Sequence, residues 1–159
     1  MTQKQEVAAV RISTRGEYGV RAMLDLAMHY GEGPIPLKTV AQRQGISEHY
    51  LEQLMSALRK AELVTSVRGA QGGYQLAAPP QEIGVGDVLR ALEGPLEPRP
   101  AQEAAPGPGQ DSIPAYGAQV LWRLLSQKIN ETLDALTLDM LCKEGAQEQA
   151  KQTAYIYHI

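Results

Sequence analysis

Residues 47–53 carry side chains of the kind that read the edges of DNA bases. Imidazole, carboxamide and carboxylate groups hydrogen-bond these edges when a helix presents them in the major groove. His49 and Gln53 are four residues apart and share one face of a helix, whereas Tyr50 points inward. The candidate base-reading residues are Ser47, Glu48, His49, Tyr50, Glu52 and Gln53. The alternative interpretation is that they are ordinary solvated helix residues.

The glycine-rich loop at residues 68–73 is a second candidate segment. Arg68 can place its guanidinium in a minor groove, while Gly69, Gly72 and Gly73 let the backbone approach a sugar-phosphate surface. A loop that cradles a nucleotide phosphate is the other possibility, but no helix and no Gly-Lys-Ser/Thr triplet follows this one. Further candidates for phosphate contacts, each also an ordinary surface group, are Arg11, Thr14, Lys38 and Arg59.

Three helices are predicted ahead of this loop. Apolar residues at helical spacing mark helices over 14–30, 37–44 and 47–61, and Gly45 lies in the tight turn between the second and the third. Two helices that meet at such a turn are typical of a helix-turn-helix. The buried face of the third helix is expected to contain Tyr50, Leu51, Leu54, Met55, Leu58 and Ala61.

The pattern becomes extended after the third helix. Residues 63–67 and 74–77 are short strand-like runs on either side of the glycine-rich loop, which predicts a hairpin. A hairpin in this position is a wing, and an amphipathic helix at 85–92 is expected to return to the core. The fold class is therefore mainly α with a small β-hairpin: a winged helix-turn-helix followed by a long C-terminal helix.

The C-terminal half begins with a Pro- and Gly-rich stretch, which is typical of a linker. Beyond it, an apolar face with no cover in so small a domain predicts dimerisation, through Val120, Leu121, Leu124, Leu125, Ile129 and Leu133. Thr137 is a candidate cap for a further helical turn. The predicted parts are an N-terminal extension (1–10), a winged domain (11–93), a linker (94–112), a dimerisation helix (113–143) and a tail (144–159) with an apolar end.

Composition narrows the classes of function. The net charge is −3, yet residues 11–76 hold eight Lys and Arg against six Asp and Glu, while the remainder holds seven against twelve. The N-terminal half is therefore the better candidate for contacting phosphates. The single cysteine, Cys142, excludes an intramolecular disulfide and a cluster that needs several thiolates from one chain, so no cofactor or metal is expected. The chain has no apolar run long enough for a membrane helix, and we expect a cytoplasmic protein.

An enzyme is the main alternative class, and the sequence disfavours it. The three histidines, His29, His49 and His158, lie far apart, with no nucleophile elbow or His-x-x-x-His motif. His29 is expected to pack at the end of the first helix rather than to act as a base. A pure protein-interaction module is a further alternative, which the intact wing argues against.

Three stretches resemble the signature segments of the Rrf2 family of bacterial transcription repressors. These are Arg11-Ile-Ser-Thr-Arg-Gly-Glu-Tyr18, Ser47-Glu-His-Tyr-Leu-Glu-Gln-Leu54 and Val67-Arg-Gly-Ala-Gln-Gly-Gly-Tyr74. Residues 92–96 and 121–124 extend the similarity over most of the chain. The resemblance implies a winged helix-turn-helix, a long helix that forms a two-fold homodimer, and a palindromic operator on double-stranded DNA.

Members of this family differ in the signal that they sense. Several bind an iron–sulfur cluster through three cysteines before the dimerisation helix, where this sequence has none. The cysteine-free branch that represses cysteine and sulfur metabolism is more similar, and it implies cysteine synthase as a partner and O-acetylserine as the signal. Tyr155, Tyr157 and Ile159 are the residues that would bind the synthase, with the carboxylate of Ile159 in its active site. One alternative is that this end packs on the dimer. The other is a repressor of the same family that senses a different signal without cysteine synthase: an iron–sulfur cluster, a redox change, for example at Cys142, or another ligand.

Overall fold

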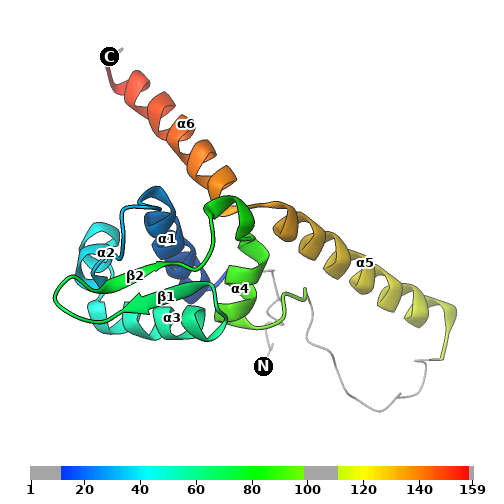
Figure 1. Ribbon diagram of the computed structural model, residues 1–159. Helices are drawn as coiled ribbons and strands as arrows, with labels where there is room; N and C mark the ends of the chain where they lie inside the picture. The colour runs from blue at the N-terminus through cyan, green and yellow to red at the C-terminus, as the bar shows by residue number, and fades with distance from the viewer. Residues whose placement is uncertain (1–11, 99–110, 158–159) are drawn as a thin grey trace, which may run out of the picture.

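The computed structural model describes residues 12–98 and 111–157 of the chain. It confirms a mainly helical fold with one hairpin, and Figure 1 shows the arrangement. The elements in chain order are α1 (Thr14–Met28), α2 (Leu37–Gln44), α3 (Glu48–Lys60), β1 (Val64–Val67), β2 (Gly73–Leu76), the 3₁₀ turn η1 (Pro80–Glu82), α4 (Val85–Glu93), α5 (Ile113–Ala135) and α6 (Leu138–Tyr157).

One apolar core holds α1 to α4 and the hairpin together. Met23 of α1, Leu54 and Leu58 of α3 and Val88 of α4 are fully buried in it. Burial of a side chain of this size contributes about 1.5–3 kcal/mol, so this core is the main source of stability for the winged unit. The predicted buried face of α3 is confirmed at its four apolar positions up to Leu58, and Tyr50 is half-buried. Ala61 was wrongly expected inside: it is the C-cap and is exposed, because the helix has already ended.

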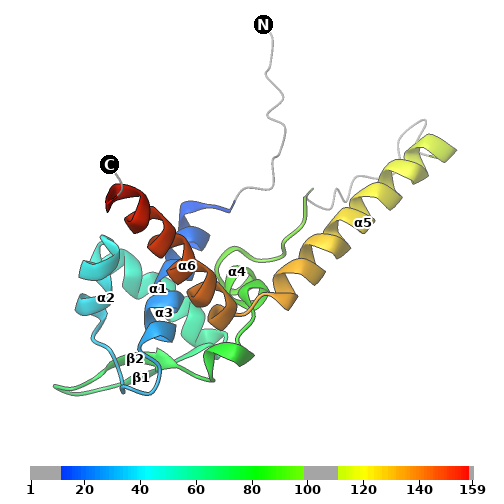
Figure 2. The ribbon, with the colours of Figure 1, turned by 90° about the horizontal axis from the view of Figure 1, so that it is seen from above.

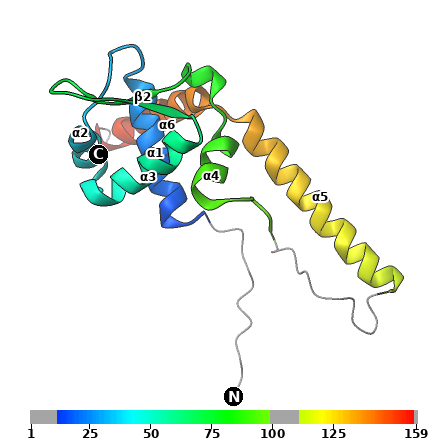
Figure 3. The same ribbon diagram turned by 60° about the horizontal axis from the view of Figure 1, so that its bottom comes forward.

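The hairpin has a simple antiparallel register. Val64 pairs with Leu76 and Val67 with Gly73, and the apolar ends Val64 and Leu76 are buried. The start of β2, close to the hairpin loop, is fastened to the loop between α1 and α2, because Ile35 and Tyr74 exchange two backbone hydrogen bonds of 2.8 and 2.9 Å. The tip extends beyond the helices in Figures 1 and 3.

The segment from 113 to the C-terminal end consists of two helices rather than one helix and a tail. The chain leaves the helical path at Leu136, and Thr137 starts α6 by accepting a hydrogen bond from the Met140 amide at 3.3 Å. The cap predicted at Thr137 is thus confirmed, whereas α6 continues to Tyr157 where a tail was expected. The reason is that the residues from 144 onward are mostly good helix formers without proline.

The junction between α5 and α6 is attached to the winged unit. Val85 donates its amide to Leu136 O at 2.8 Å, and Leu138 donates to Ile83 O at 3.0 Å, as a short antiparallel bridge. Leu138 is fully buried in the core. From this point α5 extends away from the other helices in all three ribbon views (Figures 1, 2 and 3). Within the part of the chain that the structure describes, no helix is both long and apolar enough to span a bilayer.

Candidate nucleic-acid interface

The N-terminal end of α3 is capped by its own sequence. Ser47 is extended, and its hydroxyl accepts a hydrogen bond from the Tyr50 amide at 3.2 Å. Glu48 in the first turn complements the helix dipole, while Arg59 and Lys60 complement it in the last turn. Gly45 in the left-handed conformation makes the turn from α2. The hydroxyl of Ser47 is therefore already used in the cap.

The outward face of α3 carries three of the candidate base-reading side chains together. His49, Glu52 and Gln53 are exposed, and with Ser56 they line one open hollow on the surface. The Nε2 atoms of His49 and Gln53 are 3.3 Å apart, which confirms that the two side chains lie side by side. This face offers both donors and acceptors of hydrogen bonds to a ligand.

Tyr50 faces the opposite way and supports the helix. Its ring makes an edge-on contact with Tyr18 of α1, with ring centroids 6.2 Å apart. The guanidinium of Arg21 lies over the Tyr18 ring, 5.4 Å from its centroid. Arg21 also donates to the backbone carbonyl of Gln44 at 2.8 Å, at the end of α2. Tyr50 thus packs the first turn of α3 against α1, and through Tyr18 and Arg21 against the end of α2. Its ring is directed into the protein and not toward a ligand.

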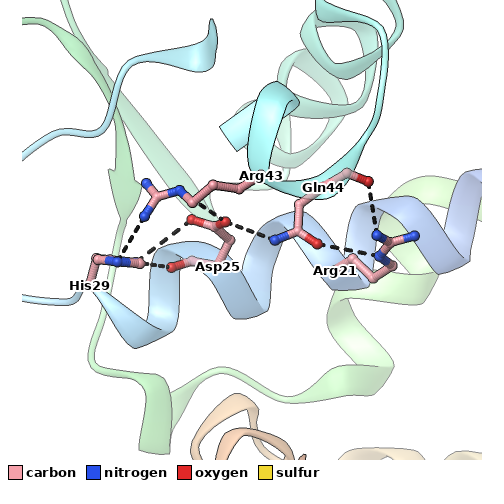
Figure 4. A network of polar contacts seen from close by, with 5 residues as sticks. All are labelled: Arg21, Asp25, His29, Arg43 and Gln44. Atoms are coloured by element: carbon pink, nitrogen blue, oxygen red, sulfur yellow. Dashed lines mark hydrogen bonds and ion pairs between the residues drawn. The ribbon is translucent and has the colours of Figure 1, made fainter. Parts of the chain in front are cut away.

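A polar cluster between α1 and α2 continues this support (Figure 4). The buried carboxylate of Asp25 accepts from Gln44 Nε2 at 2.8 Å and pairs with Arg43 Nε at 3.4 Å. His29 lies 2.8 Å from the Asp25 carbonyl through Nδ1 and 2.8 Å from Arg43 through Nε2, which is the expected packed position. Asp25 was missed by the sequence analysis. Its signal is an acid inside the apolar run of residues 22–27.

The wing places Arg68 at an exposed bend at the end of β1. The Gly72 amide donates to Gly69 O at 3.0 Å and closes the loop. Gly73 has φ +155°, and a Cβ atom there would collide with the backbone of Ile35. Glycine at 73 therefore has a packing role where the start of β2 meets the loop between α1 and α2, whereas Gly69, with φ +114° and open space around it, remains available at the tip.

The flanking candidates lie on three different elements. Thr14 is the exposed first residue of α1, whose cap is Ser13, and Lys38 is exposed in the first turn of α2. Arg59 donates to Ser66 Oγ at 3.3 Å, so it links the end of α3 to β1. Arg11 lies outside the described residues.

The apolar residues predicted for dimerisation lie on a helix with no buried residue. Val120, Leu121, Leu124 and Leu125 are exposed, and Ile129 and Leu133 are partly covered. Tyr155 and Tyr157 are exposed near the end of α6, and Ile159 lies outside the described residues.

The thiol of Cys142 is directed toward the protein. Its Sγ atom lies 3.8 Å from the carbonyl oxygen of Leu24, and the side chain packs against the core. Burial, together with the negative charge of Asp139, raises the pKa of this thiol. In residues 12–98 and 111–157, no three His, Cys, Asp or Glu side chains gather in a group that could hold a metal ion.

Comparison with known proteins matches this chain to bacterial transcriptional regulators. Residues 12–144 match the sequence model of the Rrf2 family, which is described as an iron-dependent transcriptional regulator. The chain is 43% identical over 150 residues to the HTH-type transcriptional regulator CymR of Bacillus subtilis, covering 94% of this chain and 100% of that protein. It is 46% identical over 129 residues to the regulator IscR of Sodalis glossinidius, covering 81% of this chain and 76% of that protein.

Solved structures agree with the sequence matches. The structure of CymR, described as the global cysteine regulator of B. subtilis, superposes with a TM-score of 0.71 at 45% identity. The superposition covers 84% of this chain and 97% of CymR. The winged helix-turn-helix prediction is thereby confirmed.

The family description mentions iron, but this chain lacks the cysteines that would hold an iron–sulfur cluster. Iron–sulfur clusters are held chiefly by cysteine thiolates, and this chain has one cysteine, whose raised pKa favours the neutral thiol over the ligating thiolate. Cys142 also follows the long α5 helix rather than preceding it. A cluster bound by cysteines of one chain is therefore incompatible with this sequence.

Proposed function

Because this chain belongs to the Rrf2 family of transcriptional regulators, we propose that it is a homodimeric repressor of cysteine and sulfur metabolism genes. The observation that carries DNA binding is the exposed group His49, Glu52 and Gln53 on α3, next to a wing with an exposed Arg68. The match to CymR over its full length supports the class of target gene.

Recognition of DNA is divided between α3 and the wing. α3 enters the major groove with its N-terminal half, where Gln53 and His49 hydrogen-bond base edges and Glu52 accepts from a cytosine amino group. Arg68 of the wing enters the neighbouring minor groove, and Thr14, Lys38 and Arg59 hold phosphates on either side. These assignments rest on exposure and on residue chemistry, with the first three side chains on one continuous face of α3.

The dimer forms through α5. Its exposed apolar side chains, among them Leu121 and Leu124, are too numerous for a free surface helix, and a second copy of the same helix offers a matching face. A two-fold dimer carries two α3 helices and therefore requires two half-sites in inverted orientation.

The signal reaches the repressor through cysteine synthase. Tyr155 and Tyr157 are exposed near the C-terminal end of α6, so a partner protein can reach them. Ile159 then occupies the synthase pocket in competition with O-acetylserine, so that O-acetylserine separates the complex. The regulator CymR, a match over its full length, supports this choice over a cluster-based signal, for which this chain lacks the cysteines.

The test is fluorescence anisotropy on labelled duplexes from upstream of cysteine and sulfur-assimilation genes, with an unrelated duplex of equal length as control. We expect salt-dependent specific binding that cysteine synthase strengthens and O-acetylserine weakens. Removal of residues 156–159 should abolish the effect of the synthase and leave binding of DNA alone unchanged. Specific binding with no response to the synthase would leave a repressor and reject this partner.

A further inference from the structure

Arg90 of α4 fastens the C-terminal part of α5 to the winged unit. Its guanidinium donates to Asn130 Oδ1 at 2.7 Å and forms an ion pair with Asp134, and it also lies 3.4 Å from Asp87 Oδ1. Asn130 and Asp134 are one helical turn apart on the same face of α5. One side chain of α4 therefore holds two consecutive turns of α5.

Two further features belong to this contact between α4 and α5. Asn130 donates through Nδ2 to the carbonyl of Leu96, in the chain that follows α4, at 3.3 Å. A Cβ atom at Gly86 would collide with the carboxylate of Asp134 and the guanidinium of Arg90, so a side chain at 86 would require this ion pair to shift. The contact is thus built from both helices and from the segment between them.

This is a second attachment between α5 and the winged unit. The first is the backbone bridge at Gly84 and Thr137, beyond the C-terminal end of α5. A single attachment at the end of a helix leaves the helix free to swing about that point. The second attachment, near residues 130–134, removes this freedom and gives α5 one direction relative to α3.

We propose that Arg90 is a positioning residue that sets the distance and the rotation between the two α3 helices of the dimer, and hence the spacing of the DNA half-sites. This rests on the proposed function, in which α5 carries the dimer contact. Each base pair added between two half-sites moves one of them by about 3.4 Å and turns it by about 35° around the duplex axis. A rigid dimer therefore binds one spacing, and a loosened dimer accepts several.

A merely stabilising role for Arg90 predicts a different result. Its side chain is 31% exposed, and its partners Asp134 and Asp87 are more exposed still, so loss of these ion pairs costs little folding stability. If stability were its whole contribution, removing Arg90 would leave the ranking of spacings unchanged.

The experiment uses an operator that the full-length protein selects from a library of random duplexes. Five versions of it are made, with the central spacer unchanged or altered by one or two base pairs in either direction. Arg90→Ala and Asp134→Ala are compared with the unmodified protein and with Lys128→Ala, which breaks the exposed Lys128–Glu131 pair on the same helix. Sedimentation confirms the dimer, and circular dichroism confirms the fold.

We expect the unmodified protein and Lys128→Ala to lose about tenfold or more in affinity for each altered spacing, equivalent to about 1.4 kcal/mol. Arg90→Ala and Asp134→Ala should reduce this loss to about threefold while remaining dimers. An unchanged spacing preference in both variants overturns the role of Arg90 and leaves the repressor intact. A protein that binds all spacings equally without any substitution also overturns the role of Arg90, whereas a protein that selects no operator from the library rejects the proposed DNA-binding function.

Discussion

Asp25 of α1 and Arg43 of α2 form an ion pair in which the Asp25 side chain is 3% exposed and the Arg43 side chain 35% exposed, with Nε and Oδ2 3.4 Å apart. The pair lies just before the turn that leads to α3, and Gln44 and His29 join it. A buried carboxylate is tolerated only where donors surround it, so this cluster depends on all of its members.

Substitutions in this cluster should cost stability unequally. Asp25→Ala removes the shared acceptor of Arg43 and Gln44, and we expect a loss of about 2–3 kcal/mol in the free energy of unfolding. Arg43→Ala should cost about 1–2 kcal/mol, because the Gln44 amide still donates to Asp25. Urea unfolding measures both. Lys151→Ala, which breaks the exposed Lys151–Glu148 pair, is the control and should change stability by less than about 0.5 kcal/mol.

Two glycines of the wing should respond differently to alanine. At Gly69 the space is open, so only the positive φ is penalised, and we expect a loss of about 1 kcal/mol. At Gly73 the new methyl group also meets the backbone of Ile35, which cannot move without breaking the two hydrogen bonds to Tyr74. Gly73→Ala should therefore cost about 3 kcal/mol or more. Equal losses in thermal unfolding would show that the contact with Ile35 does not constrain residue 73.

Local patterns explain why the winged unit could be predicted from the sequence. The 3.6-residue spacing of Leu51, Leu54 and Leu58, the cap at Ser47 and the turn at Gly45 all act within a few residues. The hairpin likewise follows from two short runs around glycines. Each of these signals is local, and each agrees with the packing of the finished core.

The missed features depend on contacts between distant residues. Arg90 and Asp134 are 44 positions apart, and Asp25 and Arg43 come together only when α2 packs on α1. The sequence pattern does not predict the extent of α6, because residues 144–157 lack the regular apolar face that marks the other helices. Its helical propensity alone predicts the element, and the buried Leu138 anchors its first turn.

The base-reading and phosphate-binding groups should separate in their dependence on salt. Lys38→Ala is expected to weaken binding to all DNA sequences alike and to reduce the slope of log affinity against log salt by about one. Gln53→Ala should leave that slope unchanged and lower discrimination at one base pair by about 1–3 kcal/mol. Anisotropy titrations at several salt concentrations, on the operator and its single-base variants, measure both quantities. If Lys38→Ala changed discrimination and Gln53→Ala changed the slope, the roles given to Lys38 of α2 and Gln53 of α3 would be reversed.

The thiol of Cys142 should be protected at neutral pH. Burial and Asp139 raise its pKa above the ordinary value, so the reactive thiolate forms only at higher pH in the folded protein than in the unfolded chain. The stability that the neutral thiol contributes is thus fully present below the ordinary pKa and is lost as pH rises through the raised one. We expect slow modification by a thiol reagent at pH 7, a steep increase in rate only at a pH above the ordinary pKa of a thiol, and faster modification in denaturant than in the folded protein at either pH. Cys142→Ser should remove the part of the alkaline loss of stability that this thiol causes. Rapid modification of the folded protein at pH 7 would instead identify an accessible thiolate and would return redox sensing to consideration.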